Sequence, residues 1–181
     1  MSLWKVFMKN LTKLGIFLVA GLFAVGVHSE PLNFDVGYSK LHYKESGTPT
    51  DDIDHVKFAV SRNDFEALLS FNVRSAKGTY RSFSYEVTVP YILGLYYKPE
   101  IHLGAGIDLF ARVGITHASA EVKGTNSSVK TASSGNDLGF GLGMSMLSTK
   151  TTKVTLDYTS YYNRSGVAIN GFSLTNTFLF P

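Results

Sequence analysis

The stretch IHLGAGIDLFARVGIT, residues 101–116, alternates two kinds of side chain with a period of two. Every second residue from Ile101 to Ile115 is apolar, and the residues between them include Asp108, Arg112 and three glycines. Successive side chains of a β-strand point to opposite faces of the sheet. The stretch therefore predicts one long strand with an unbroken apolar face and a second face that carries ionised groups.

The same alternation occurs in seven other segments, so we expect eight strands. The other seven are residues 34–39, 55–62, 65–74, 85–95, 137–146, 153–159 and 171–180. The expected connections are long at 44–54, 76–84 and 120–135, short at 63–64, 98–100 and 149–152, and modest at 163–166. Long and short connections in alternation predict an up-and-down meander in one domain. Pro90 interrupts a strand because it lacks an N–H, so we expect a bulge there or a strand that begins later.

The first 29 residues have the pattern of a cleaved secretory signal peptide. Lys5, Lys9 and Lys13 precede or flank the apolar run LGIFLVAGLFAVGV, and Ser29 fits the last position before the cut. A single anchoring helix is the alternative, near the short limit for a membrane span. Removal of residues 1–29 takes three lysines from a chain with 17 basic and 14 acidic residues, so the domain at 30–181 is formally neutral. Its charge gives no reason to expect nucleic-acid binding.

The composition excludes some classes of protein. There is no cysteine among the 181 residues, so a disulfide scaffold and Cys-based metal or redox sites are excluded. Charged residues make up only 17% of the chain, compared with about a quarter in typical soluble proteins. No histidine has metal-ligand spacing, and we expect no metal and no cofactor.

The alternation fits two kinds of barrel that are turned inside out relative to each other. A soluble lipocalin-like carrier points its apolar residues inward, whereas a membrane barrel points them outward to lipid. Glycines on the polar set favour the membrane barrel, since a narrow lumen has room only for small side chains. The length of the apolar faces favours it too, because ordinary strands have about 5–6 residues. Tyrosines at strand ends suit the headgroup level.

A membrane barrel must balance the charges in its lumen, because an unpaired buried charge is very costly. Seven charged residues fall on the polar set, and we expect them to form a salt-bridge network inside the barrel. They are Glu66, Arg74, Glu86, Asp108, Arg112, Lys153 and Asp157. The sequence thus predicts an all-β, eight-stranded antiparallel up-and-down transmembrane barrel, preceded by the signal peptide.

The chain resembles the small outer-membrane β-barrel family of Gram-negative bacteria, which includes the OmpX/Ail-like and opacity proteins. The similarity rests on the leader, the eight strands, the glycine spacing in LGAGIDLFARVG and DLGFGLGMSM, and the terminal FSLTNTFLF. In that family the assembly machinery reads alternating apolar residues and a final aromatic, here Phe172, Leu174, Phe178 and Phe180. Asn176 interrupts this apolar set and Pro181 follows the last Phe, so the chain departs from the pattern twice.

Two other functions remain open from the sequence. His117 and Ser119 share the outward set with Glu121, and lipid A deacylases use a similar His-x-Ser pair, although theirs lies near the C-terminus. A hydroxyl nucleophile needs an imidazole base and a carboxylate that orients it. Asp108 and Arg112 are candidates to line a narrow pore, but an eight-stranded barrel leaves little lumen.

We expect a non-enzymatic, monomeric protein of the bacterial outer membrane with a structural or surface-interaction role. The loop at 120–135 is rich in hydroxyl groups, and Tyr80, Arg81 and Phe83 form an aromatic and basic cluster. These loops are the expected contact surface for lipopolysaccharide or for a host or envelope ligand. The expected partners also include outer-membrane lipid and the assembly machinery, and exclude nucleic acid.

Overall fold

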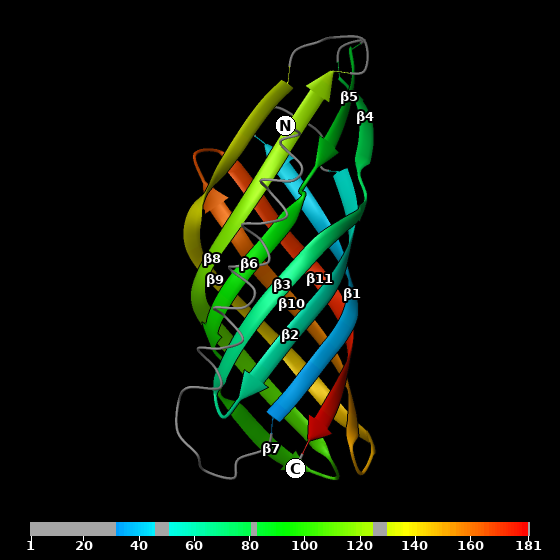
Figure 1. Cartoon of the computed structure of the whole chain (residues 1–181), viewed down its shortest axis with the longest axis vertical. Coiled ribbons are helices and arrows are strands. Elements are labelled where there is room, and N and C mark those ends of the chain that lie inside the picture. The colour runs from blue at the N-terminus through cyan, green and yellow to red at the C-terminus, as the bar shows by residue number, and fades with distance from the viewer. Residues whose placement is uncertain (1–31, 46–50, 81–82, 125–129, 181) are drawn as a thin grey trace, which may run out of the picture. The chain divides into compact units, whose positions relative to one another are not determined.

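The structure, a computed structural model of the whole chain, describes residues 32–45, 51–80, 83–124 and 130–180 (Figure 1). The predicted signal peptide, residues 1–29, lies outside the described residues, as do Arg81 and Pro181. Nowhere in the described ranges is there a helix with the length and apolar character needed to span a membrane.

All described secondary structure apart from turns is β-strand. The segments are β1 (Leu32–Glu45), β2 (Asp51–Arg62), β3 (Phe65–Arg74), β4 (Ala76–Tyr80), β5 (Phe83–Thr88), β6 (Tyr91–Tyr97), β7 (Glu100–Gly104), β8 (Ile107–Gly124), β9 (Lys130–Thr149), β10 (Thr152–Arg164) and β11 (Val167–Phe180).

These segments make eight antiparallel barrel strands. Ser75 divides one barrel strand into β3 and β4, and two proline-containing breaks divide the next into β5, β6 and β7. The three pieces lie in succession along β8, where Thr88 pairs with Glu121, Ile92 with Ala118 and Glu100 with Phe110. The other six barrel strands are single segments. The prediction of eight strands is confirmed.

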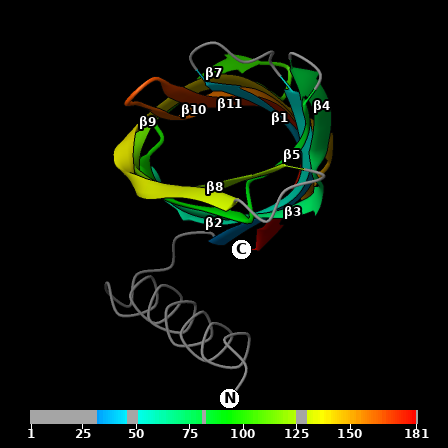
Figure 2. The same cartoon turned by 90° about the horizontal axis from the view of Figure 1, so that it is seen from above.

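The sheet closes on itself, as Figure 2 shows from above. The first and last strands, β1 and β11, pair over their whole length, from Leu32 opposite Phe180 to Glu45 opposite Val167. β8 pairs with β9 to complete the ring. Closure leaves no open sheet edge at the level where all eight strands pair, which is the condition for a sheet to cross a bilayer.

One predicted strand is wrong: residues 101–115 contain a hairpin turn. Gly104, Ala105 and Gly106 all have positive φ, and β7 runs back along β8 with Ile101 opposite Leu109. The alternation hides the turn, because residues paired across it have the same parity and face the same side. The true strand, β8, is longer than predicted, with 18 residues.

The short turn predicted at 98–100 is also wrong. The chain continues from β6 into β7 there, and the side chain of Lys98 is buried in the barrel. The Lys98 amide donates to the carbonyl of Asp64 in the neighbouring turn. The predicted turns at 63–64 and 149–152 are confirmed. Together with the turn at 104–106, they lie at the lower end of the barrel in Figure 1.

Pro90 produces the predicted interruption. β5 ends at Thr88 and β6 begins at Tyr91, and the carbonyl of Pro90 still accepts a hydrogen bond from the amide of Asn72. The break reverses the faces of the strand, because Val87 and Val89 are buried whereas Leu93 and Leu95 lie on the outside with Tyr91. The prediction that residues 85–95 present one continuous apolar face is therefore wrong.

Much of what the sequence assigned to long loops is strand. Residues 76–80 and 83–84 belong to the hairpin of β4 and β5, and residues 120–124 and 130–135 extend β8 and β9. These segments lie at the upper end of the barrel in Figure 1. The chain therefore builds a sheet above the barrel rim from residues that were expected to form loops.

Candidate functional site

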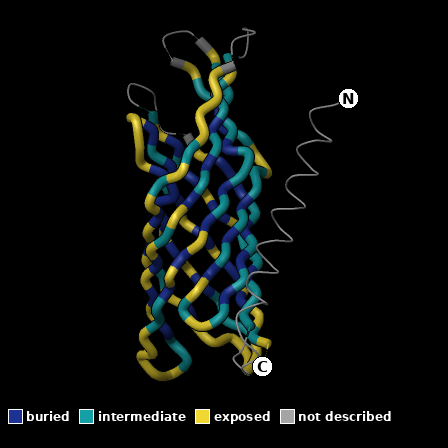
Figure 3. Tube along the Cα trace, turned by 60° about the vertical axis from the view of Figure 1, so that its left-hand side comes forward, coloured by how far each residue is buried: buried dark blue, intermediate teal, exposed yellow. Residues whose placement is uncertain are grey.

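The outside of the barrel carries a continuous apolar belt. On β9, the exposed residues Leu138, Phe140, Leu142 and Met144 alternate with residues that are buried or half-buried. Figure 3 shows buried, intermediate and exposed residues in alternation along the chain of the barrel. Other exposed members of the belt are Tyr38, Phe65, Leu95, Tyr97, Ile101, Leu103, Leu109, Val113, Ile115, Met146, Leu156, Tyr158, Phe172, Leu174, Phe178 and Phe180. An apolar surface of this extent on a closed barrel is suited to hydrocarbon rather than water.

Charged residues mark the upper limit of the belt on β1 and β2. Above Tyr38, the outward residues of β1 are Lys40 and His42, and both contact Asp52 on β2. Lys40 Nζ lies 2.9 Å and His42 Nδ1 2.6 Å from the Asp52 carboxylate. The hydrogen bond that Lys40 donates lowers the pKa of Asp52. A charged cluster directly above an apolar belt suits the level at which a barrel leaves the hydrocarbon for the headgroup layer.

Inside the barrel, ionised side chains form one connected chain of contacts. Acidic and basic residues alternate along it, so each inner member lies between two residues of the opposite type, and the terminal contact of His102 is an ion pair only when the imidazole is protonated. The contacts are Lys57–Asp157 at 2.7 Å, Asp157–Arg112, Arg112–Glu66, Glu66–Lys98 and Lys98–Glu100 at 3.4 Å each, Glu100–Lys153 at 3.5 Å, Lys153–Asp108 at 2.6 Å and Asp108–His102 at 2.5 Å. We call these nine residues the lumen ion chain.

The lumen ion chain runs from a dry middle to a wet lower end. The side chains of Lys57, Asp157, Arg112 and Glu66 are each at most 1% exposed, whereas that of His102 at the other end is 76% exposed. Burial costs each of these ions its hydration, which only close partners offset. At most 1% exposure also means that no water-sized space adjoins these side chains, so the lumen is filled at this level.

Aromatic rings from β6 and β8 complete the packing around the cations. Lys98 Nζ lies 4.5 Å from the centre of the Phe110 ring, and the Arg112 guanidinium lies 5.2 Å from Phe110 and 5.6 Å from Tyr96. These separations are in the cation–π range. The opposite strand, β9, makes room with glycines: a Cβ at Gly143 would collide with Phe110 and approach the Asp157 Cβ to 2.7 Å.

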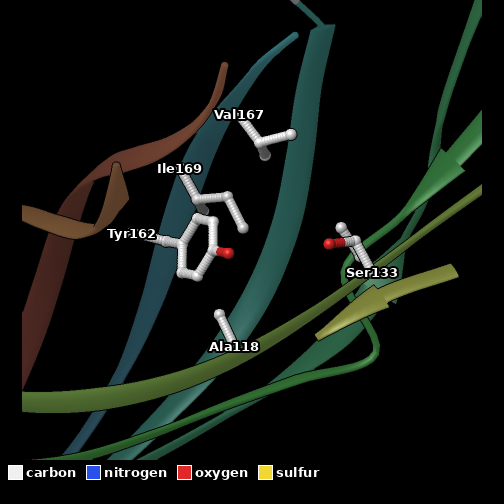
Figure 4. Close-up of a pocket in the computed structure, with 6 residues that line it drawn as sticks. Ala118, Ser133, Tyr162, Val167 and Ile169 are labelled. Atoms are coloured by element: carbon white, nitrogen blue, oxygen red, sulfur yellow. The ribbon is translucent and has the colours of Figure 1, made fainter. Parts of the chain in front are cut away.

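An apolar cluster, which we call the apolar plug, lies in the lumen beside the lumen ion chain and above it. Leu41, Ile53, Leu68, Ile92 and Tyr161 are buried there at 0–2% exposure. Other members are Tyr43, Ala59, Ala76, Val87, Val89, Tyr96, Ala118, Ala120, Tyr162, Val167 and Ile169. A cavity of about 10 Å³ between Ala118 and Tyr162 (Figure 4) holds at most about one water molecule.

The structure brings together five of the seven charged residues that the sequence placed in the lumen: Glu66, Asp108, Arg112, Lys153 and Asp157. The other two lie elsewhere, which corrects the prediction. Arg74 is exposed at the upper rim, 2.6 Å from Asp54. Glu86 lies on β5 beyond the Pro90 break, where the strand has reversed its faces, and is opposite Lys77 and Lys123.

Four members of the lumen ion chain were missed: Lys57, Lys98, Glu100 and His102. Lys57 alternates with Val56 and Phe58, so its inward orientation was readable from the sequence. Lys98 and Glu100 were assigned to a turn that does not exist, and His102 to a strand whose hairpin partner could not be seen. All four residues fit the alternation of inward and outward side chains. At Lys98 and Glu100 the wrongly predicted turn at 98–100 concealed this pattern.

His117 does not assemble with Ser119 as a nucleophile requires. His117 Nδ1 lies 2.7 Å from the Asn136 side-chain oxygen, and its Nε2 lies 3.4 Å from the Tyr91 hydroxyl. The Tyr91 and His117 rings also stack, with centroids 5.9 Å apart. Both imidazole nitrogens are therefore engaged by other groups, which leaves neither to activate the Ser119 hydroxyl.

The expected loop contacts lie largely outside the described residues. Arg81 is outside them, and only the backbone of Tyr80 and Phe83 is described, as the last pair of the β4–β5 hairpin. The terminal residues Phe172, Leu174, Phe178 and Phe180 point outward into the belt.

Comparison with solved structures shows the same fold in small outer-membrane barrels. Ail, the attachment invasion locus protein of Yersinia pestis, is 15% identical, with 84% of this chain and 100% of that chain covered and a TM-score of 0.55. Neisserial surface protein A is 12% identical, with 84% and 99% covered and a TM-score of 0.56. The N-terminal β-barrel domain of Pseudomonas aeruginosa OprF is 13% identical, with 83% and 98% covered and a TM-score of 0.50.

No protein-family profile matches this chain, and no curated protein matches it either. Identity this low shows the fold alone. That fold, together with the outward apolar belt and the charged interior, confirms the predicted transmembrane barrel and contradicts the soluble carrier, whose faces would be reversed. The expected location in the bacterial outer membrane agrees with these neighbours.

Proposed function

We propose that this chain is a closed, non-enzymatic barrel of the outer membrane that acts through its upper surface. The observation that carries the proposal is the filled lumen: four ionised side chains at mid-barrel are at most 1% exposed. A barrel without a path through its centre offers its outer surfaces to partners. Among the described residues, the connections at the lower end are short turns, so the upper end is where a ligand finds an extended surface.

Among the described residues, the upper end carries a four-stranded sheet in the order β4–β5–β8–β9. We call it the upper sheet, and it comprises Ala76–Tyr80, Phe83–Thr88, residues 118–124 and residues 130–135. Pairing between β9 and β10 ends at Phe140 opposite Ser160, so within the described residues the first ten residues of β9 pair only with β8. A strand edge of this kind is a template for an extended segment of another protein.

The fold neighbours support a role at the cell surface. One of them is an attachment invasion protein, and it has been solved in complex with the heparin analogue sucrose octasulfate. By analogy we propose a surface ligand for this chain too, alongside outer-membrane lipid and lipopolysaccharide. We also propose cleavage of residues 1–29 and reading of Phe172, Leu174, Phe178 and Phe180 by the assembly machinery.

Shortening one hairpin tests the proposal. Residues 121–132 of the upper sheet are replaced by Asn-Gly, which joins β8 to β9 in a two-residue turn where Glu121 faces Ala132. A matched control replaces the lower turn at 150–151 by Asn-Gly. We expect both proteins to keep the heat-modifiable gel mobility of a folded barrel. Cells that display the shortened protein should lose most of their binding to a heparin-coated surface, whereas the control should keep it.

Two results would contradict the proposal. Equal binding by the shortened and full-length proteins would show that the upper sheet is not the contact surface. Steady ion conductance of the full-length protein in a planar bilayer would show that the lumen is open and would favour a pore instead.

A further inference from the structure

Asn176 places an amide in the middle of the lipid-facing belt. It is exposed and points outward from β11, where the outward residues in order are Phe172, Leu174, Asn176, Phe178 and Phe180. It is thus the third of five outward positions on this strand. All other exposed large residues of the belt, within the part of the chain that the structure describes, are aliphatic, aromatic or methionine.

The amide has no partner within its own barrel. Its cross-strand neighbours are Val36 on β1 and Val154 on β10, neither of which offers a polar side-chain atom. Its side chain makes no hydrogen bond with any residue that the structure describes. In hydrocarbon an amide loses its hydrogen bonds to water without replacement, so this position is unfavourable for an isolated barrel.

We infer that Asn176 marks a contact between two copies of this chain within the membrane. A primary amide carries both a donor and an acceptor. Two copies related by a two-fold axis along the membrane normal hold the same residue at the same depth, facing itself. The two Asn176 amides then donate to each other and satisfy both groups. This inference rests on the proposed membrane orientation and replaces the monomer expected from the sequence.

The surroundings of Asn176 allow a second barrel to come close. Val36 and Val154 are half-buried and shorter than the Phe and Leu residues above and below them on β11. Because these two side chains are shorter than their neighbours, a second barrel can approach Asn176 until a side-chain hydrogen bond forms. The seam formed by β10, β11 and β1 therefore combines a self-complementary polar group with the close approach that it needs.

Energy transfer between labelled copies in vesicles tests the inference. The chain has no cysteine, so Lys150→Cys in the lower turn gives a single site for a donor or an acceptor dye. Labelled proteins are mixed in phosphatidylcholine vesicles and diluted with lipid. We expect Asn176→Leu to need about tenfold more protein per lipid for half-maximal transfer, the loss expected for two modest hydrogen bonds. The control Leu174→Val keeps the Asn176 amide. It should reach half-maximal transfer at the same protein-to-lipid ratio as the protein that carries Lys150→Cys alone.

The outcomes separate this inference from the proposed function. Asn176→Leu makes the belt more apolar, so the variant is expected to fold, and heat-modifiable mobility checks insertion in every sample. A protein that inserts but shows only chance transfer at all dilutions, or the same dilution curve with and without Asn176, would overturn the inference alone. Failure to insert would overturn the membrane barrel as well.

Discussion

At the scale of single residues, contacts between side chains of opposite charge stabilise the barrel interior. Each buried ion of the lumen ion chain is close to an opposite charge, as in Lys57–Asp157 at 2.7 Å and Lys153–Asp108 at 2.6 Å. Removal of one partner leaves the other buried charge with only part of its compensation, which costs more than the pair contributes. The stability of the barrel should therefore respond more to breaking a pair than to removing both members.

Lys57→Met tests this asymmetry. The substitution removes the nearest cation of Asp157 and leaves Arg112, 3.4 Å away, as its remaining cation, so the free energy of unfolding should fall by about 1–3 kcal/mol. The double variant Lys57→Met/Asp157→Leu should recover part of that loss, because Arg112 keeps Glu66 as a partner. Urea unfolding in vesicles measures both values. A double variant that is less stable than Lys57→Met would contradict the explanation.

At the scale of elements, parity explains which predictions succeeded. Inward and outward sets were readable from alternation on β8, β9, β10 and β11, because their faces continue without a break through the belt. Alternation could not locate the turn at Ala105, since Ile101 and Leu109 are odd-numbered partners on one face. It could not follow the strand past Pro90 either, where an irregularity exchanges the faces.

The 104–106 turn depends on backbone conformation more than on side-chain contacts. Gly104 has φ of 89°, and a Cβ at this position would meet no other atom within 4 Å. The loss of stability in Gly104→Ala therefore measures the backbone strain of a non-glycine residue at this φ, without a contribution from side-chain clashes. We expect the substitution to cost about 1 kcal/mol in unfolding free energy. Ala105, with φ of 51°, is the matched control, because Ala105→Gly relieves the same kind of strain and should be neutral or slightly stabilising. Equal loss in both variants would contradict the assigned turn.

At the scale of the whole molecule, the sequence sufficed for the barrel and for its orientation. Both follow from the two environments of every strand: the outward side chains face lipid and the inward side chains face the barrel interior. The same alternation of apolar and polar residues therefore recurs on each strand. The lumen contents were only half predictable, since which charges meet depends on the register between strands distant in sequence, as for Glu66 and Arg112. Part of the apolar plug was missed because the reversal at Pro90 turns Val87 and Val89 inward, and Ile53, another member, was assigned to the long connection at 44–54.

Nitroxide scanning of β10 in lipid vesicles tests the orientation of the faces most directly. Single cysteines at Thr155, Leu156, Thr159 and Tyr158 carry the label, and collision with oxygen reports contact with hydrocarbon. We predict high oxygen accessibility at 156 and 158 and low accessibility at 155 and 159, whose native side chains are buried in the lumen. High accessibility at 155 and 159 with low values at 156 and 158 would show that the charged face meets the lipid.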